Sequence, residues 1–399
     1  MPRAKPNILW VLTTQWRGQA TGFAGDPNAR TPCLDRLAAS GVSIRNAVTP
    51  HPFGPFARAA ILTGVPSPEN GVVDYWDPLP AGSRTIAHEM SALGYSTAWF
   101  GKWHLAERDR SAPLVGEVHA RQIVSESRRG GFEFWEGFES GFLLNDPWLH
   151  GTRLPEPVQF RGYQADVISG RAAEWLSAKR SATPWFAVVS LESPHPPYDA
   201  PSVKVPHRNP ASIVLDTNVP RGGEVEARAR RELAGYYAHI EATDAAIGRL
   251  CDALPENNIV VITSVHGDMH GAHGLFRKGW PHEESVRVPL IVRGGWFRNL
   301  APGTVASLID LSAMTRAWAV GEDWEFSEAA RISMPAVVAL PHQCDRVWRG
   351  VRTAEWMLAL NADGTPWLLF DLRADPTQMA NLVDEPEYAM VIERLQALV

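Results

Sequence analysis

Residues 6–18 read PNILWVLTTQWRG, an apolar run that begins after a proline and ends in polar residues. A continuous apolar run of this length is typical of a strand that is buried on both faces of a parallel sheet. The pattern returns in PWFAVVSL at residues 184–191 and in NIVVITS at residues 258–264. We therefore predict three buried parallel strands, the first over residues 7–13.

Helical periodicity separates these runs. It appears in TPCLDRLAASG at residues 31–41, in SRTIAHEMSALG at residues 83–94, and over residues 228–254. The first of these helices has Thr31 as its N-cap and Gly41 as its stop signal. Strands that alternate with helices indicate an α/β fold, a large and mainly parallel sheet with helices on both faces.

The working site of such a sheet lies outside the carboxyl ends of its strands. Thr13, Thr14 and Gln15 follow the first strand, and Val265 and His266 follow the strand at residues 258–264. We expect these two segments to be neighbours at the site.

The pattern changes after residue 345. Residues 346–376 alternate apolar and polar side chains around an Asn-Ala-Asp-Gly turn, which predicts a small antiparallel sheet, and residues 386–398 predict a terminal helix. We expect an α/β domain over residues 1–345 and a C-terminal subdomain over residues 346–399. Long loops are expected at residues 106–131 and 199–224, either as elements over the site or as plain surface excursions.

Composition limits the function classes. The chain has 399 residues, a net charge of -6 and no charge runs, so neither a nucleic-acid surface nor a membrane surface is indicated. The first apolar run is too short for a signal peptide or a membrane span, and we expect a cytoplasmic protein.

The three cysteines, Cys33, Cys251 and Cys344, lie far apart in the sequence, which predicts reduced thiols and no disulfide framework. The oligomeric state stays open, a homo-oligomer included.

Several motifs, in order along nearly the whole chain, resemble those of the type I sulfatases of the alkaline phosphatase superfamily. They are PNILWVLTTQWRG, TPCLDRLAASG, ARAAILTG at residues 57–64, GYSTAWFGKWHL at 94–105, GYQADVISGRAAEWL at 162–176, LESPHPPY at 191–198 and TSVHGDMHGAHGLFRKGW at 263–280. The resemblance implies the sulfatase fold, with the small antiparallel sheet as its C-terminal subdomain.

The resemblance also implies a metal site, which this sequence does not preserve. The family holds a divalent cation, usually calcium, with carboxylates and an amide or imidazole. The corresponding positions carry Thr14, Gln15, Val265 and His266. Valine binds no cation, so we expect neither a metal nor another cofactor.

The family nucleophile is missing as well. In the family, a cysteine that is converted to formylglycine stands four residues before the arginine, and that position is Gly54. A shift of one residue gives Phe53, which also lacks a nucleophile. Thr13, Thr14 and Thr49 are conceivable replacements, but a hydroxyl without a metal needs an adjacent base.

Five basic residues match family positions. In the family the arginine and first lysine steady the nucleophile, the two histidines act on the nucleophile and leaving oxygen, and the second lysine grips the sulfate. These residues are Arg58, Lys102, His104, His195 and Lys278. The resemblance implies catalytic roles for Lys102, His104 and His195, and anion binding by Arg58, Lys102 and Lys278. Taken singly, each is more often a surface charge, a strut or a turn residue, but five matched positions favour a common cationic pocket.

A histidine-rich segment follows the last predicted strand. His266, His270 and His273 lie in HGDMHGAH with Asp268 among them. Imidazoles suit zinc, iron or copper, so a transition-metal site is one interpretation. Scattered loop histidines are the interpretation that we favour.

Three functions are compatible with the sequence. The first is a repurposed enzyme that acts on a small sulfate, phosphate or carboxylate by acid/base chemistry of His104 or His195, without a metal or formylglycine. Elimination, isomerisation or transfer would suit it. The second is a non-catalytic anion-binding protein, and the third is a conventional sulfuric ester hydrolase. We favour the first, because a passive binder has little need for two histidines beside its lysines.

Overall fold

The computed structural model describes residues 3–179, 183–202, 205–255 and 257–399. Its main sheet has nine strands in the order β2-β10-β9-β1-β8-β4-β5-β6-β7. Five central strands run parallel: β9 (Asn258–Ser264), β1 (Asn7–Thr13), β8 (Trp185–Ser190), β4 (Ser96–Lys102) and β5 (Phe134–Phe138). Antiparallel strands extend both edges: β10 (Leu290–Arg293), β2 (Val42–Ser43), β6 (Trp148–Gly151) and β7 (Leu154–Gln159). The predicted α/β class is confirmed.

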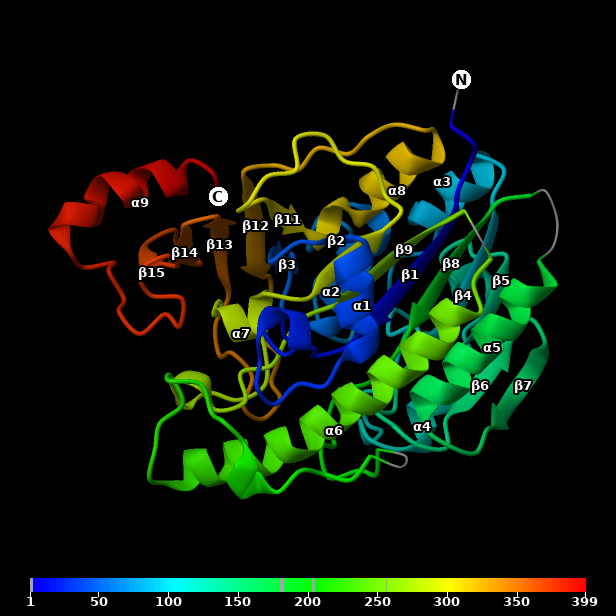
Figure 1. The fold of residues 1–399 in the computed structure, drawn as a ribbon, viewed down its shortest axis with the longest axis horizontal. Helices are drawn as coiled ribbons and strands as arrows, with labels where there is room; N and C mark the ends of the chain where they lie inside the picture. Colours follow the sequence, from blue (N-terminus) through cyan, green and yellow to red (C-terminus); the bar gives the residue numbers. More distant parts are fainter. Residues whose placement is uncertain (1–2, 180–182, 203–204, 256) are drawn as a thin grey trace.

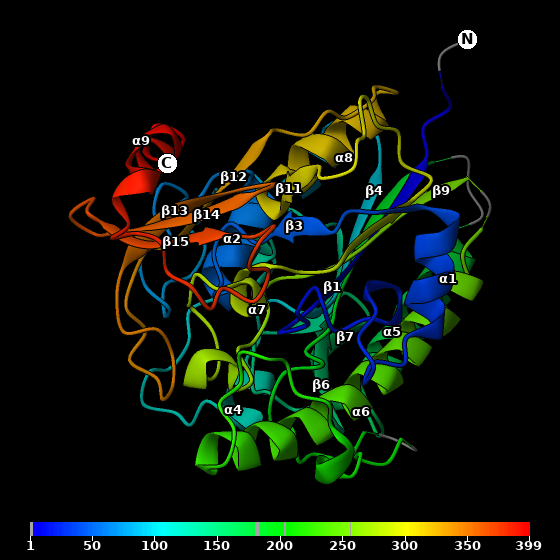
Figure 2. The same ribbon diagram turned by 60° about the vertical axis from the view of Figure 1, so that its left-hand side comes forward.

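Helices cover both faces of this sheet, because alternate residues of its strands point to opposite sides. Ile8, Trp10 and Leu12 of β1 pack in the core with α2 (Gly54–Thr63), α3 (Ile86–Ala92) and α8 (Leu311–Ala319). Leu9 and Val11 pack in the opposite core with α1 (Pro32–Ser40), α5 (Gln164–Ala178) and α6 (Glu224–Asp252). Figure 2 shows α1 and α6 on one side of the sheet and α2 and α8 on the other.

A second, antiparallel sheet lies with α9 (Ala389–Gln396) at one end of the molecule (Figure 1). Its order is β12 (Ala329–Met334), β13 (Trp348–Thr353), β14 (Trp356–Asn361) and β15 (Pro366–Asp371). The first strand of this sheet lies upstream of residue 345, so the predicted boundary falls between β12 and β13. Ile332, Trp348 and Phe370 share the core that contains α2 and α8, which fixes this sheet to the main body.

Most predicted elements have the expected bounds. The strands at 7–13 and 258–264 and the helix within 31–41 are confirmed, and the terminal helix is preceded by a short 3-10 turn at Pro386–Tyr388. The long helix begins at Glu224 rather than at 228. The predicted loop at 106–131 contains the one-turn helix α4 (Glu117–Ala120), and that at 199–224 contains a 3-10 turn at Pro210–Ser212. Residues 203–204 of the latter loop lie outside the described residues.

The remaining elements are short. β3 (Asn46–Val48) pairs with β11 (Val305–Ser307), and α7 (Glu283–Val286) follows the histidine-rich segment. None of the helices in the described ranges has the length and apolar character needed to cross a membrane.

Candidate functional site

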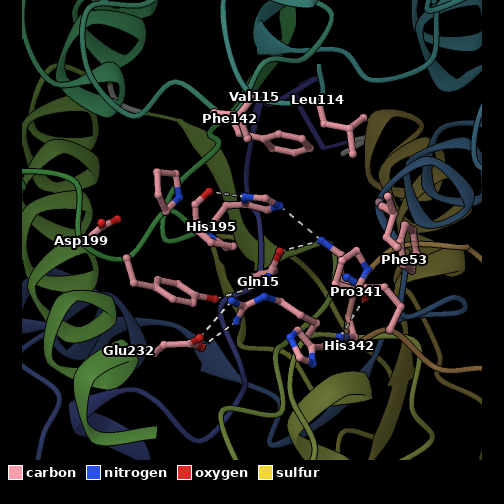
Figure 3. A pocket seen from close by; sticks show the side chains of 18 of the residues that line it. Gln15, Phe53, Leu114, Val115, Phe142, His195, Asp199, Glu232, Pro341 and His342 are labelled. Carbon is pink, nitrogen blue, oxygen red and sulfur yellow. Dashed lines mark hydrogen bonds and ion pairs between the residues drawn. The ribbon is translucent and has the colours of Figure 1, made fainter. Parts of the chain in front are cut away.

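A pocket of about 780 Å³ opens at the carboxyl ends of the central strands. Its wall contains the predicted site residues Gln15, Gly54, His104, His195 and Lys278. Figure 3 shows Gln15 and His195 in this wall. Apolar side chains form much of the remaining wall: Phe53, Tyr75, Leu114, Val115, Phe142 and Leu340. Leu114 and Val115 come from the first predicted loop and Asp199 from the second, so both loops contribute to this pocket.

Lys278 forms the cationic floor of the pocket. Its ammonium donates to Gln15 Oε1 at 2.6 Å and to His195 Nε2 at 3.3 Å. An ammonium has three N–H donors, so one is left for a ligand. Burial, and then the charge of Lys102, lower the pKa of Lys278 to about 7. Lys278 therefore titrates near neutral pH.

His195 is held as a neutral imidazole. Its Nδ1 donates to the carbonyl oxygen of Pro196 at 2.6 Å, so its Nε2 is the acceptor that faces Lys278. Burial, and then the charges of Lys278 and Lys102, lower the pKa of His195 well below its usual value. Its ring stacks on Phe142, with the ring centroids 4.5 Å apart. Nε2 is thus bound by Lys278 at the floor of the pocket, and its lone pair is available to a ligand only when this N–H turns away.

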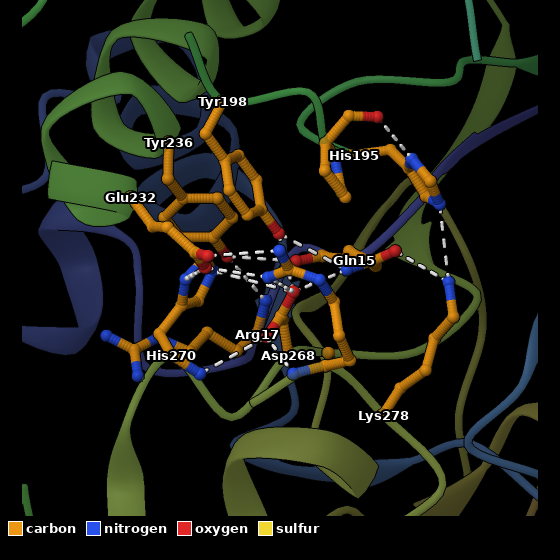
Figure 4. Close-up of polar contacts among 12 residues, drawn as sticks. Gln15, Arg17, His195, Tyr198, Glu232, Tyr236, Asp268, His270 and Lys278 are labelled. Carbon is orange, nitrogen blue, oxygen red and sulfur yellow. Dashed lines mark hydrogen bonds and ion pairs between the residues drawn. The ribbon is translucent and has the colours of Figure 1, made fainter. Parts of the chain in front are cut away.

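A buried acid behind the floor fixes the orientation of Gln15. Asp268 Oδ2 accepts from Gln15 Nε2 at 2.5 Å and from the Tyr198 hydroxyl at 2.5 Å (Figure 4). His270 and Arg277 donate their backbone N–H groups to Asp268 Oδ1. Although burial opposes ionisation, the neighbouring His270 and Arg277 charges and these hydrogen bonds keep the pKa of Asp268 below its usual value. The amide oxygen of Gln15 is thereby turned toward Lys278.

Arg58 lies behind the pocket wall. Its guanidinium donates to Ser190 Oγ at 2.6 Å and to Thr14 Oγ1 at 2.9 Å. Burial lowers its pKa to about 10, so it stays charged at neutral pH. Arg58 does not belong to the pocket lining, and its predicted direct contact with an anion is replaced by these internal hydrogen bonds.

Lys102 is also placed behind the wall and is neutralised by a carboxylate. Its ammonium lies 2.6 Å from Glu192 Oε1, and both side chains are buried. Burial is the main cause that lowers the pKa of Lys102, to about 8, and Glu192 opposes the change. Lys102 lies 4.6 Å from the ring centroid of Phe142, which supports His195. Its position suits it to position other residues rather than to contact the substrate.

His104 has one nitrogen bound inside the protein and one facing Gly54. Arg108 Nη1 donates to His104 Nε2 at 2.8 Å. Burial, followed by the charges of Lys102 and Arg108, lowers the pKa of His104 well below its usual value. Glu139 accepts the backbone N–H groups of Leu105 and Ala106 and holds this turn. A neutral His104 that accepts at Nε2 carries its proton on Nδ1, so it donates toward the pocket.

Gly54 is the first residue of α2 and carries no reacting group. A β-carbon built on Gly54 lies 3.1 Å from His104 Nδ1 and 3.9 Å from His266 Nε2. Phe53 beside it is buried and also lines the pocket. The two positions in question for the family nucleophile are therefore side by side at the wall, and neither supplies a nucleophile.

The residues at the family metal positions do not fit a divalent cation. The Thr14 hydroxyl donates to the Leu191 carbonyl at 3.0 Å and accepts from Arg58, and both ends of the Gln15 amide are bound as described above. Val265 is fully buried and apolar. His266 Nδ1 contacts the Gly267 carbonyl at 2.9 Å. Arg58 and Lys278 thus donate hydrogen bonds to Thr14 and Gln15, at positions where a divalent cation would need anionic oxygen ligands.

The histidine-rich segment does not form a metal centre. Across the described ranges, no group of three or more His, Cys, Asp and Glu side chains is placed to hold a metal ion. His270 lies against Tyr236, with ring centroids 4.3 Å apart, whereas His273 lies against His282 at 4.5 Å. His266 faces Gly54 instead, so the three imidazoles point to different surroundings.

The conceivable replacement nucleophiles are bound elsewhere. The hydroxyls of Thr13, Thr14 and Thr49 donate to backbone carbonyls, and the pocket lining includes none of the three. The three cysteines are buried, and burial raises their pKa values, to about 12 for Cys33 and to about 11 for Cys251 and Cys344. A thiol with a raised pKa is a weak nucleophile.

Several residues of the site were not singled out from the sequence. They are Arg108, Glu139, Phe142, Glu192 and Tyr198. Glu192 lies three residues before His195 in LESPHPPY, and this spacing after a buried strand was the available signal. The others lie in irregular segments, where the sequence gives no periodic pattern to place a side chain.

The fold and site define an α/β protein with a cationic pocket at the carboxyl ends of its parallel strands. The family model Sulfatase matches residues 6–296. The ulvan-active sulfatase of Formosa agariphila is 36% identical over 98% of this chain and 80% of that protein. The chain therefore belongs to the sulfatase family, within the alkaline phosphatase superfamily.

Two further comparisons agree with this family. The arylsulfatase of Clostridium perfringens is 26% identical over 99% of this chain and 93% of that protein. The structure of the yidJ protein from Bacteroides fragilis matches with a TM-score of 0.81 at 23% identity, over 99% of this chain and 94% of that one. The structural match shows that the fold is shared.

Proposed function

We propose that this chain acts on a small sulfate ester by metal-independent acid/base chemistry in the pocket. The observation that carries the proposal is the contact between Lys278 and His195, which places a cation and a neutral base side by side in the pocket wall. Lys278 binds the anionic group of the substrate with its remaining N–H donor. The names of the family relatives support a sulfate group as that anion.

The roles in this reaction follow from the contacts. When the Lys278 N–H that contacts His195 turns to the substrate anion, the Nε2 lone pair is released and accepts a proton from the substrate, while the Nδ1 contact with Pro196 fixes the ring. Lys278 stabilises negative charge that develops next to it, and Gln15, oriented by Asp268, keeps the ammonium in place. Elimination, isomerisation or transfer needs no covalent intermediate and fits a site without a side-chain nucleophile.

A second candidate is a protein that binds a sulfate ester and does not transform it. The observation that favours it is Gly54, which leaves the position of the family nucleophile without a side chain. The third, conventional sulfate ester hydrolysis, is favoured by the relatives' names. It requires a metal and a nucleophile that Thr14, Val265 and Gly54 do not supply.

The decisive experiment measures turnover after removal of metals. Chelator-treated protein is assayed by mass spectrometry with a panel of sulfated, phosphorylated and carboxylated sugars and aryl esters. We expect turnover that persists in chelator, that is lost in His195→Gln and that is retained in His207→Gln, whose residue is exposed outside the pocket lining.

Each other function gives a different result in the same experiment. Thermal stabilisation by a sulfated ligand without any turnover would establish the binding protein. Aryl sulfate cleavage that appears only after calcium is added would establish conventional hydrolysis. Either result would refute metal-independent chemistry at His195.

A further inference from the structure

Two buried imidazole nitrogens face the empty position of the Gly54 side chain. His104 Nδ1 and His266 Nε2 have no hydrogen-bond partner among the described residues. His104 is 4% exposed and His266 is fully buried. Buried polar atoms are nearly always hydrogen-bonded in folded proteins, so a pair of unpartnered atoms aimed at one space indicates a missing partner. We call the space between Gly54, His104 and His266 the Gly54 niche.

The two nitrogens are complementary. Arg108 can only donate, so His104 Nε2 accepts and its neutral ring is protonated at Nδ1. The Gly267 carbonyl can only accept, so His266 Nδ1 donates and its neutral ring has a free lone pair at Nε2. The niche therefore presents one donor and one acceptor.

The backbone does not require glycine at this position. Gly54 is not among the glycines with a left-handed φ, and it lies in the first turn of α2, where other residues are accommodated more favourably than glycine. A β-carbon would meet only His104 at close range, at 3.1 Å from Nδ1. Backbone conformation therefore does not account for the glycine, whereas the close approach of the His104 ring to this position does.

We propose that the Gly54 niche binds a hydroxyl oxygen, which accepts from His104 Nδ1 and donates to His266 Nε2. A hydroxyl is both a donor and an acceptor, as the niche requires. An anionic oxygen carries no proton that it could donate to His266 Nε2. The oxygen belongs either to a water molecule or to an alcohol group of the ligand. Binding of a hydroxyl in the niche does not require turnover. As a subsite for a sugar hydroxyl, the niche would be part of the proposed active site, and this part of the proposal rests on the proposed function.

The first test is a crystal structure at high resolution, grown without alcohols and then soaked in ethylene glycol. We expect an oxygen within hydrogen-bond distance of both nitrogens. Water that persists in the soak assigns the niche to water, and replacement by ethylene glycol assigns it to an alcohol. An empty niche, or an anion identified by its anomalous signal, would overturn the proposal.

The second test compares Gly54→Ser with Gly54→Ala. Both introduce the same β-carbon, but only serine supplies a hydroxyl to the two imidazoles. We expect Gly54→Ser to have the higher melting temperature, although alanine is the better helix former. The difference should disappear in a His266→Leu background.

A higher melting temperature for Gly54→Ala in the otherwise unchanged protein would contradict the proposal. Neither the crystal structure nor the melting temperatures require activity. Failure of the niche is therefore distinguishable from failure of the proposed reaction, which the chelator assay tests.

Discussion

Arg58 and Lys102 differ from Lys278 in where their charges are directed. The first two lie behind the pocket wall, where Thr14, Ser190 and Glu192 bind them. Lys278 belongs to the wall itself, and within the described part of the chain its ammonium donates hydrogen bonds only to neutral partners, Gln15 and His195. All three cations occupy family positions, yet only Lys278 is arranged to meet an anion.

The difference shows how partners determine the role of a buried cation. A buried charge needs compensation, and Glu192 compensates Lys102 from within the protein. Lys278 has no carboxylate within ion-pair distance among the described residues, so its charge is not compensated from within this part of the protein. We therefore expect changes behind the wall to affect stability, and changes at Lys278 to affect binding.

The largest effect is expected from Glu192→Gln. It leaves the buried Lys102 without its counter-charge, and breaking a buried ion pair costs about 3–5 kcal/mol of unfolding free energy. Urea denaturation at pH 7 measures the loss. Glu387→Gln is the matched control, because Glu387 is exposed and should change stability little. A loss as small as that of the control would mean that Lys102 is not compensated by Glu192.

Lys278→Met should abolish binding of sulfate. Saturation at one hundred times the dissociation constant stabilises a protein by about 2.7 kcal/mol, and this gain should vanish in the variant. The measurement is the melting temperature with increasing sodium sulfate and sodium chloride held at matched ionic strength. Lys179→Met, remote from the pocket lining, should keep the sulfate response. An unchanged response in Lys278→Met would place the anion elsewhere.

Thr14→Val should cost about 1–3 kcal/mol, because it leaves one buried donor of Arg58 without an acceptor. Valine is similar in shape to threonine, so packing should change little. The exposed Thr217→Val provides the comparison under the same denaturation conditions. Equal stability of the two variants would show that the Arg58 contact contributes nothing, and that Thr14 is free for another role.

The smallest effect is the pH dependence of sulfate affinity. The pKa of Lys278 is lowered to about 7, and the charged form binds the anion, so affinity should fall as pH rises through 7. The Lys278 side chain changes from mostly charged at pH 6 to mostly neutral at pH 8, so sulfate binding should weaken by about tenfold over this range. Calorimetry across this range tests the slope. Affinity that rises with pH would have the wrong sign.

The sequence predicted the fold well, because local pattern decides it. Continuous apolar runs set β1 and β9, and Thr31 and Gly41 flank α1 as predicted. Thr31 makes no capping hydrogen bond, however; Asp244 of α6 accepts the N–H groups of Cys33 and Leu34 instead, a contact that local sequence does not show. The boundary of the small sheet was less accessible. β12 lies at the edge of that sheet, and residues 335–347 join it to β13, a connection too long to carry the tight-turn signal that joins β14 to β15.

The site was predicted as a set of residues but not as a set of contacts. Gly54, His104, His195 and Lys278 do line one pocket. The burial of Arg58 behind that pocket depends on Thr14 and Ser190, which lie on different segments and meet only in the folded chain. Metal-independent chemistry and cytoplasmic localisation stay predictions.

The most direct test is calorimetric titration of sulfate into chelator-treated protein, repeated with calcium and with Lys278→Met. We predict one sulfate bound per chain without metal, unchanged affinity when calcium is added, and no binding to the variant. Binding that appears only with calcium, or that persists in Lys278→Met, would contradict a metal-independent anion site at Lys278.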